Sequence, residues 1–167
     1  MSIVIVTGLG PRTGTSFVMQ QALQKGIPIH GYKFIPNFTV EEHNIDGYWE
    51  TPVYHPTIDN CLVKLWYPAY LNVDSNKISG VIALERKDKI AQLASLYKVF
   101  KDECKLNKQL LELESPSSLL LPFIENTEQW LSSLNTKQIM RVYTEDLNAS
   151  ITNILSFIER GITCQHS

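Results

Sequence analysis

Residues 6–17 read Val6-Thr7-Gly8-Leu9-Gly10-Pro11-Arg12-Thr13-Gly14-Thr15-Ser16-Phe17. A short apolar segment at 3–6 precedes this stretch, and a helical pattern follows it over 17–23. A strand, a glycine-rich turn and a helix in that order are typical of an anion-binding motif. Backbone N–H groups at the helix start converge on a phosphate or sulfate, and the helix dipole favours negative charge there. The glycines let the backbone turn tightly and approach the anion closely.

The loop departs from the nucleoside-triphosphate pattern, which has a lysine directly after the last glycine. Thr15 stands in that place, and the nearby cation is Arg12, inside the loop. Arg12 supplies a planar fork of donors that fits a sulfuryl or phosphoryl group. We expect four consecutive backbone N–H groups and three hydroxyl groups from Thr13, Gly14, Thr15 and Ser16. The alternative is an ordinary glycine-rich turn between a strand and a helix.

Length and composition predict one domain, spanning residues 1–167. The chain is 44% hydrophobic and 19% charged, which suits a packed core and argues against disorder. Its net charge of −2 does not suggest a general nucleic-acid or membrane-surface binder. The three cysteines lack metal-ligand spacing, so we expect free thiols. With no signal-like start and no apolar run of membrane-spanning length, we expect a soluble, cytoplasmic protein.

Apolar runs predict strands at 3–6, 61–66, 79–84 and 138–143, with a short extended piece at 27–29. Between them lie helical patterns: 17–23, which Lys25-Gly26 is predicted to end, a helix opening at Asp88 with Ile90 on its apolar face, and a region over about 116–134. A final helix is predicted to stop at Gly161. Alternating strands and helices favour an α/β fold with a mostly parallel central sheet flanked by helices.

Ligands of such sheets bind outside the carboxyl ends of the strands. The loop at 8–16, residues 66–68, Arg86 and the pair Glu145-Asp146 all follow predicted strands, so we expect them at one edge. Lys64, in an otherwise apolar strand, is most simply explained if it points at an anion. The alternative is a snorkelling lysine on an edge strand. For Arg86 the alternative is a surface arginine paired with Asp88.

Metal-assisted phosphoryl transfer is disfavoured by this pattern. It uses a loop lysine on the phosphates and a strand-end aspartate for magnesium. Neither feature is present. The loop has no lysine, and the apolar runs of two predicted strands are followed by Lys64 and by Glu85-Arg86 instead of an aspartate. We therefore expect no metal site.

The sequence resembles the sulfotransferases that use 3′-phosphoadenosine-5′-phosphosulfate (PAPS). Pro11–Ser16 is similar to their 5′-phosphosulfate loop, and Leu84–Tyr97 is similar to the segment in which an Arg and a Ser hold the 3′-phosphate. Val142–Leu147 resembles a Tyr-Glu-Asp-Leu segment near the end of the family core. Asp46–Glu50 resembles a Gly-Tyr-Tyr-Glu segment of some bacterial members. The matches come in family order and cover nearly the whole chain.

This resemblance implies a three-layer P-loop fold and the transfer of a sulfuryl group from PAPS, the co-substrate. The acceptor would be a hydroxyl or amine of a small molecule or carbohydrate, and no metal would be required. Arg12 and the loop residues Thr13, Gly14, Thr15 and Ser16 would bind the 5′-phosphosulfate. Arg86 and Ser95 would bind the 3′-phosphate. Lys64 matches a family lysine that reaches the transferring group from the second strand.

Many members carry a catalytic histidine two residues after that lysine, and this chain has Trp66 there. Glu50 is then the expected proton acceptor, because bacterial members often use a carboxylate from this early region; a solvated loop glutamate is the alternative. His43 and His55 are reserves. We expect Glu145 and Asp146 to cap the last helix. Two other functions stay open: a non-catalytic homologue that binds an adenosine phosphate or sulfate, and a small P-loop phosphotransferase.

Overall fold

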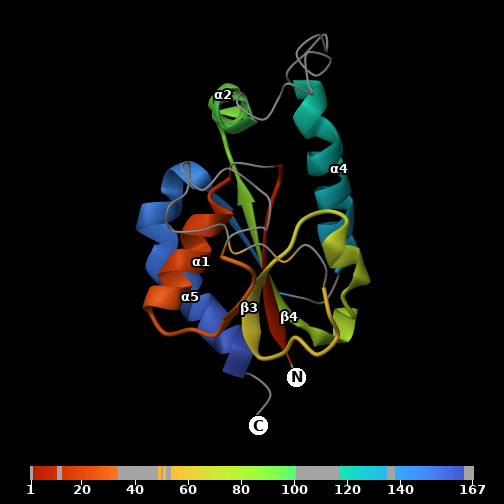
Figure 1. The fold of residues 1–167 in the computed structure, drawn as a ribbon, viewed down its shortest axis with the longest axis vertical. Coiled ribbons are helices and arrows are strands. Elements are labelled where there is room, and N and C mark those ends of the chain that lie inside the picture. Colours follow the sequence, from red (N-terminus) through yellow and green to blue (C-terminus); the bar gives the residue numbers. More distant parts are fainter. Residues whose placement is uncertain are drawn as a thin grey trace.

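A computed structural model describes residues 2–10, 13–33, 49, 51, 54–100, 117–134 and 138–163. Within these ranges the chain forms one five-stranded sheet (Figure 1). Its strands lie in the order β2-β3-β1-β4-β5, and every neighbouring pair is parallel. Their bounds are β1 Ile3–Gly8, β2 Ile29–His30, β3 Cys61–Lys64, β4 Ile78–Glu85 and β5 Gln138–Tyr143. The predicted α/β class is confirmed, and the sheet is parallel throughout.

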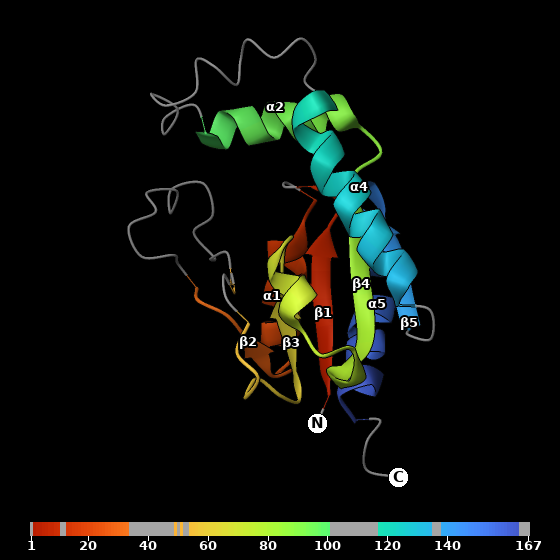
Figure 2. The same cartoon turned by 90° about the vertical axis from the view of Figure 1, so that its right-hand side faces the viewer.

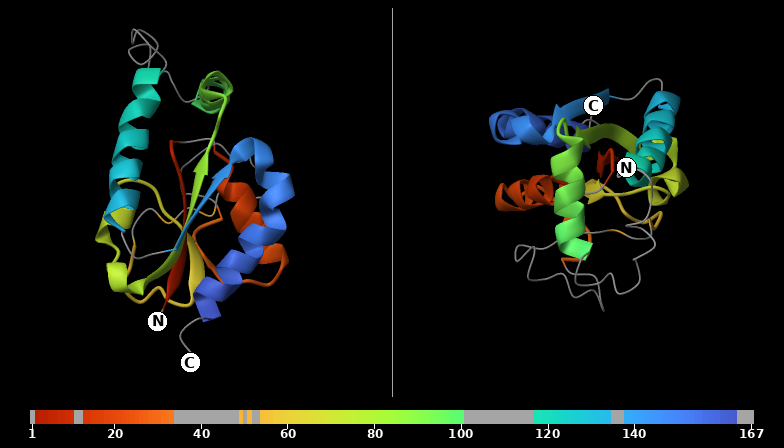
Figure 3. Two further views of the ribbon diagram at one scale, coloured as in Figure 1. Left: turned by 180° about the vertical axis from the view of Figure 1, so that it is seen from behind. Right: turned by 90° about the horizontal axis from the view of Figure 1, so that it is seen from above.

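Helices lie on both faces of the sheet and make three layers. Helices α1 (Thr15–Gln24) and α5 (Leu147–Thr163) cover one face, whereas α4 (Ser117–Ser133) covers the other (Figure 1). Figure 2 shows α2 (Lys89–Phe100) crossing above the ends of the strands rather than packing along a face. Seen from behind and from above, the two outer layers lie on opposite sides of the sheet (Figure 3). None of the helices described is long and apolar enough to cross a membrane.

The strands form where apolar side chains alternate between two cores. All six residues of β1 are buried, and successive side chains of a strand point to opposite faces. Ile3 and Ile5 join the core under α4, together with Tyr70, Trp130 and Leu131. Val4 and Val6 join the core under α1 and α5, whose members include Met19, Leu62, Leu84, Ile154, Phe157 and Ile158.

The strand register brings three strand ends to the same edge. Val6 pairs with Lys64 of β3, and Gly8 pairs with Leu84 of β4. From β1 the chain turns into α1 on one face, whereas from β4 it passes to α2 and then to α4 on the other side. Adjacent strands whose connections leave in opposite directions open a crevice at their carboxyl ends, where ligands of such sheets bind.

Helix boundaries agree with the sequence at the end of α1 and differ at the end of α5. Lys25 ends α1, and Gly26 follows with a φ of 80°, as the sequence predicts. Gly161 does not stop α5, which runs on to Thr163. A Cβ atom at Gly161 would lie 2.5 Å from Val4 Cγ2, so this glycine permits close packing of α5 on β1.

Ile90 was expected on the buried face of α2, but it is 81% exposed. The helix crosses above the sheet and buries a different side, which includes Gln92. Periodicity identifies an apolar stripe but cannot say that a helix sits on a sheet edge.

Candidate functional site

The glycine-rich loop between β1 and α1 has the backbone that an anion site needs. Gly14 precedes α1 with a φ of 91°, and Gly10 has a φ of 89°, both in the left-handed region that favours glycine. A Cβ atom at Gly14 would lie 2.5 Å from Leu147 Cδ1 at the start of α5. The N–H groups of the first turn of α1 therefore start at the sheet edge, as predicted.

The three hydroxyl groups of this loop differ in their surroundings. The Thr13 side chain is fully buried, and its Oγ1 donates to the Gly10 carbonyl oxygen at 3.4 Å. It closes the loop on itself. Thr15 is 3% exposed, so it too lies largely inside the protein. Ser16, partly buried, has the hydroxyl group that meets the second element of the site.

That second element is Lys64, the last residue of β3. Its side chain is 1% exposed, and Nζ donates to Ser16 Oγ at 3.0 Å. The register partner of Lys64 is Val6, so the lysine faces the α1 side of the sheet. Because β3 lies between β2 and β1, the alternative of a lysine snorkelling from an edge strand is wrong.

Trp66 borders both the lysine and the loop. The Lys64 ammonium lies 5.5 Å from the Trp66 ring centroid, within the range of a cation–π interaction. A Cβ atom at Gly8 would lie 3.0 Å from Trp66 Cζ3, so the indole packs closely over the end of β1. Trp66 is therefore part of the wall beside Lys64.

Arg86 follows directly after β4 and is partly buried. Within the described parts of the chain, no hydrogen bond or ion pair engages its guanidinium. Among the described residues, Arg86 forms no ion pair with Asp88, whose Oδ1 accepts from the Ala91 N–H at 2.8 Å and caps α2. The neighbouring Glu85 instead pairs with Lys89 at 3.3 Å. Arg86 is thus a cation at the carboxyl edge of the sheet, directly after the end of β4.

Helix α2 rests on the loop through Gln92, which the sequence alone did not assign to the site. Gln92 is fully buried, and its Nε2 donates to the Leu9 carbonyl oxygen at 3.4 Å. Ser95 lies three residues further along α2 and hence on the same side of that helix. It is partly buried. The fold therefore brings the helix that carries Ser95 onto the loop, with Ser95 on the face that Gln92 directs there.

A turn between β5 and α5 (Thr144–Asp146) contacts both the loop and the segment after Arg86. Thr144 Oγ1 lies 2.7 Å from the Thr13 carbonyl oxygen and 3.1 Å from that of Glu85. The Glu145 carboxylate accepts from the backbone N–H groups of Lys87 and Asp88, each at 3.2 Å.

These contacts add to the expected role of this turn. Besides its own N–H group, the Glu145 carboxylate binds the segment between β4 and α2, and Asp146 pairs with the Lys87 ammonium at 3.0 Å. Sequence reasoning also missed Thr144. Its signal was weak, because the contacts join residues more than fifty positions apart.

Arg12, Glu50 and His43 lie outside the described residues, so their predicted roles stay predictions. His55 is described, and it is not at the site. It is exposed, its ring Nδ1 lies 2.8 Å from Thr57 Oγ1, and the neighbouring Pro56 carbonyl accepts from Lys77. Lys77 directly precedes the amino end of β4, the opposite edge of the sheet. The segment that carries His55 therefore lies at the amino edge of the sheet, whereas the loop 13–16, Lys64 and Arg86 lie at the carboxyl edge. The prediction of His55 as a reserve base is wrong for this reason.

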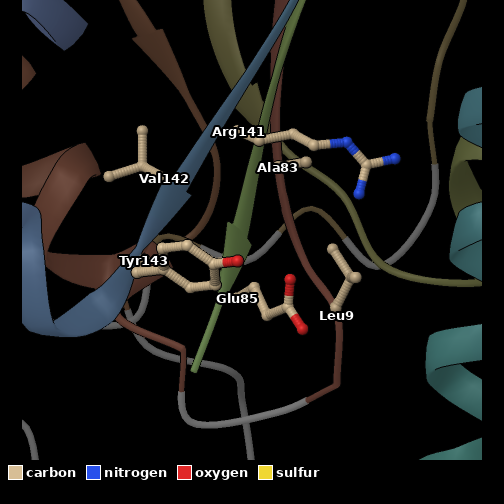
Figure 4. A pocket seen from close by; sticks show the side chains of 6 residues that line it. All are labelled: Leu9, Ala83, Glu85, Arg141, Val142 and Tyr143. Atoms are coloured by element: carbon tan, nitrogen blue, oxygen red, sulfur yellow. The ribbon is translucent and has the colours of Figure 1, made fainter. Parts of the chain in front are cut away.

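A small hollow of about 130 Å³ lies beside the carboxyl ends of β4 and β5 (Figure 4). It is lined by Leu9, Ala83, Glu85, Arg141, Val142 and Tyr143. The Arg141 guanidinium points away from Tyr143 and forms a two-pronged ion pair with Glu128, with contacts of 2.7 and 2.6 Å. Ligand pockets typically measure about 300–1,000 Å³, so this hollow is too small to hold a nucleotide.

Comparison with known proteins gave no match, either to a family model or to a curated protein. Among the described residues, no group of three or more His, Cys, Asp or Glu side chains has the spacing of a metal site.

Proposed function

We propose that this protein is a sulfotransferase that moves a sulfuryl group from PAPS to a hydroxyl or amine of a small-molecule or carbohydrate acceptor. The proposal combines the sequence resemblance with the geometry of the strand ends. The loop 13–16, Lys64 and Arg86 come from three adjacent strands, and all follow or end those strands at the same edge.

The contact between the buried Lys64 and the partly buried Ser16 supports the proposal most strongly. Placing an ammonium group inside a protein is costly unless anions or strong hydrogen-bond acceptors surround it. Here the lysine ends a buried strand and reaches the first turn of α1, where backbone N–H groups favour a bound anion. A cation and a helix start that converge in this way can together bind an anion that carries both a phosphate and a sulfate group, such as a phosphosulfate.

The proposed reaction needs positioning and charge neutralisation more than covalent chemistry. The acceptor oxygen or nitrogen forms a bond to sulfur, and the bond between sulfur and the 5′-phosphate oxygen breaks. Adenosine 3′,5′-bisphosphate leaves, and the acceptor proton passes to a base, for which Glu50 is the candidate. Lys64 and Arg12 would neutralise the charge that develops on the departing phosphate, while Arg86 and Ser95 would hold the 3′-phosphate.

The test is transfer of labelled sulfate from PAPS to an acceptor library, in the presence of a metal chelator. Transfer by the wild type that is lost in Lys64→Met supports the proposal. Binding of adenosine 3′,5′-bisphosphate without any transfer to a broad library would favour the non-catalytic homologue. A Glu50→Gln variant that keeps full turnover would reject Glu50 as the base while leaving the rest of the proposal standing.

A further inference from the structure

The turn at 144–146 contacts both halves of the proposed site without carrying a positive charge itself. Thr144 Oγ1 lies 2.7 Å from the Thr13 carbonyl oxygen, just before Gly14 and the start of α1. Its methyl carbon would lie 3.7 Å from a Cβ atom at Gly14. One hydroxyl group donates one hydrogen bond at a time, and the shorter distance favours Thr13 over Glu85. The turn therefore packs directly on the anion loop.

The same turn also forms hydrogen bonds to the chain on both sides of Arg86. Before it, the Glu85 carbonyl oxygen lies 3.1 Å from Thr144 Oγ1; after it, the Lys87 and Asp88 N–H groups donate to Glu145. Desolvation alone would raise the pKa of Glu145. Its own N–H group, those of Lys87 and Asp88, and nearby Arg86 together outweigh it and lower that pKa below the usual 4.5. Glu145 is thus held as a carboxylate on these N–H groups.

The position of Glu145 needs explaining, because a carboxylate beside an anion site repels the ligand. A role in holding backbone accounts for it. The N–H groups of Lys87 and Asp88 neutralise part of the Glu145 charge. The Lys87–Asp146 ion pair at 3.0 Å also attaches the segment 86–88, between β4 and α2, to the turn. These contacts fix where the Arg86 side chain starts relative to the loop 13–16.

We propose that the 144–146 turn is a positioning element that sets the separation between the loop 13–16 and Arg86, and so selects nucleotides with phosphates at both the 5′ and the 3′ positions. This inference rests on the proposed function. A ligand with one anion needs one of the two sites. A ligand with two anions gains its extra affinity when both sites stand at the matching separation, so loosening one of them removes that gain.

The test compares the binding of adenosine 3′,5′-bisphosphate and adenosine 5′-monophosphate by calorimetry. Glu145→Ala is expected to weaken bisphosphate binding by about tenfold or more, with the 5′-monophosphate affinity changed by about twofold at most. Glu145→Gln keeps an oxygen that accepts one N–H group, so it should fall between wild type and Glu145→Ala. Glu128→Gln is the matched control, because Glu128 is a carboxylate on α4 that pairs with Arg141 on β5.

Amide hydrogen exchange gives a second measurement that needs no ligand. In Glu145→Ala the N–H groups of Lys87 and Asp88 should exchange faster, while Glu128→Gln leaves them unchanged. Equal loss of affinity for both nucleotides, or unchanged exchange at these two N–H groups, overturns the inference. If the wild type binds neither nucleotide, the proposed function fails and the selection of bisphosphates fails with it, whereas the exchange rates still decide whether Glu145 holds this connection.

Discussion

Lys64 is the side chain on which the site depends most, since it is a cation with 1% exposure at the end of a buried strand. Replacing it with methionine keeps much of its length and removes the charge. Hydrogen bonds to charged groups are worth about 1.5–3 kcal/mol, so Lys64→Met should weaken the binding of adenosine 3′,5′-bisphosphate by about tenfold or more. Its unfolding free energy should fall by about 1.5–3 kcal/mol, because the hydrogen bond from the Lys64 ammonium to Ser16 Oγ is lost. Calorimetry and urea denaturation measure the two quantities.

Lys25→Met is the control for this variant. Lys25 is an exposed lysine just after α1 that pairs with Glu159 at 3.0 Å, and exposed pairs contribute little to stability. It should bind the bisphosphate like wild type. Unchanged affinity in Lys64→Met would contradict the assignment of Lys64 to the anion site.

Cys61 at the start of β3 makes stability depend on pH in the alkaline range. Burial, assisted by nearby Asp59, raises the pKa of its thiol from 9.0 to about 11. Folding thus favours the neutral thiol. Its contribution to stability is fully present below pH 9 and is lost as the pH rises to about 11. The free energy of unfolding should therefore fall more steeply over this range in wild type than in Cys61→Ala.

Urea denaturation of both proteins between pH 8 and pH 11, under reducing conditions, measures this difference. Tyr54, whose pKa burial also raises, is present in both proteins, so its titration largely cancels in the comparison. A constant difference between the two proteins across the range would refute the prediction.

At the scale of elements, the packing of α5 on β1 depends on Gly161. A Cβ atom there would lie 2.5 Å from Val4 Cγ2, and the fully buried Val4 has little room to move. Gly161→Ala should lower the free energy of unfolding by about 1–3 kcal/mol, although alanine is the better helix former. Asn153→Ala, an exposed position on the same helix, should be neutral or slightly stabilising. Chemical denaturation compares the two, and equal stability of Gly161→Ala and wild type would show that the contact relaxes freely.

The elements were largely predictable from the sequence, because buried parallel strands appear as apolar runs between turn residues. The runs at 3–6, 79–84 and 138–143 all became strands, and Lys25-Gly26 ended α1 as predicted. The stop at Gly161 was not predictable, since a glycine that ends a helix and one that allows close packing look alike in sequence. The exposure of Ile90 was not predictable either, because the sequence does not show that α2 crosses the edge of the sheet instead of packing on a face.

At the scale of the whole molecule, the parallel sheet converts distant sequence segments into neighbours. Sequence order and the rule for strand ends were enough to gather the loop, Lys64 and Arg86 at one edge. They could not place His55, which lies toward the opposite edge, or reveal how Thr144 and Glu145 contact that site. Such contacts depend on the register of strands and on the direction in which each turn leaves the sheet.

The central claim is that this edge binds a nucleotide with a 3′-phosphate and does so without magnesium. Thermal denaturation with adenosine 3′,5′-bisphosphate in a metal chelator, set against ATP with magnesium, tests it most directly. A ligand at a hundred times its dissociation constant stabilises a protein by about 2.7 kcal/mol, or about 5–11 °C for a domain of this size. We predict a shift of this order with the bisphosphate and a much smaller one with ATP and magnesium. A larger shift with ATP and magnesium, or none with the bisphosphate, would contradict the claim.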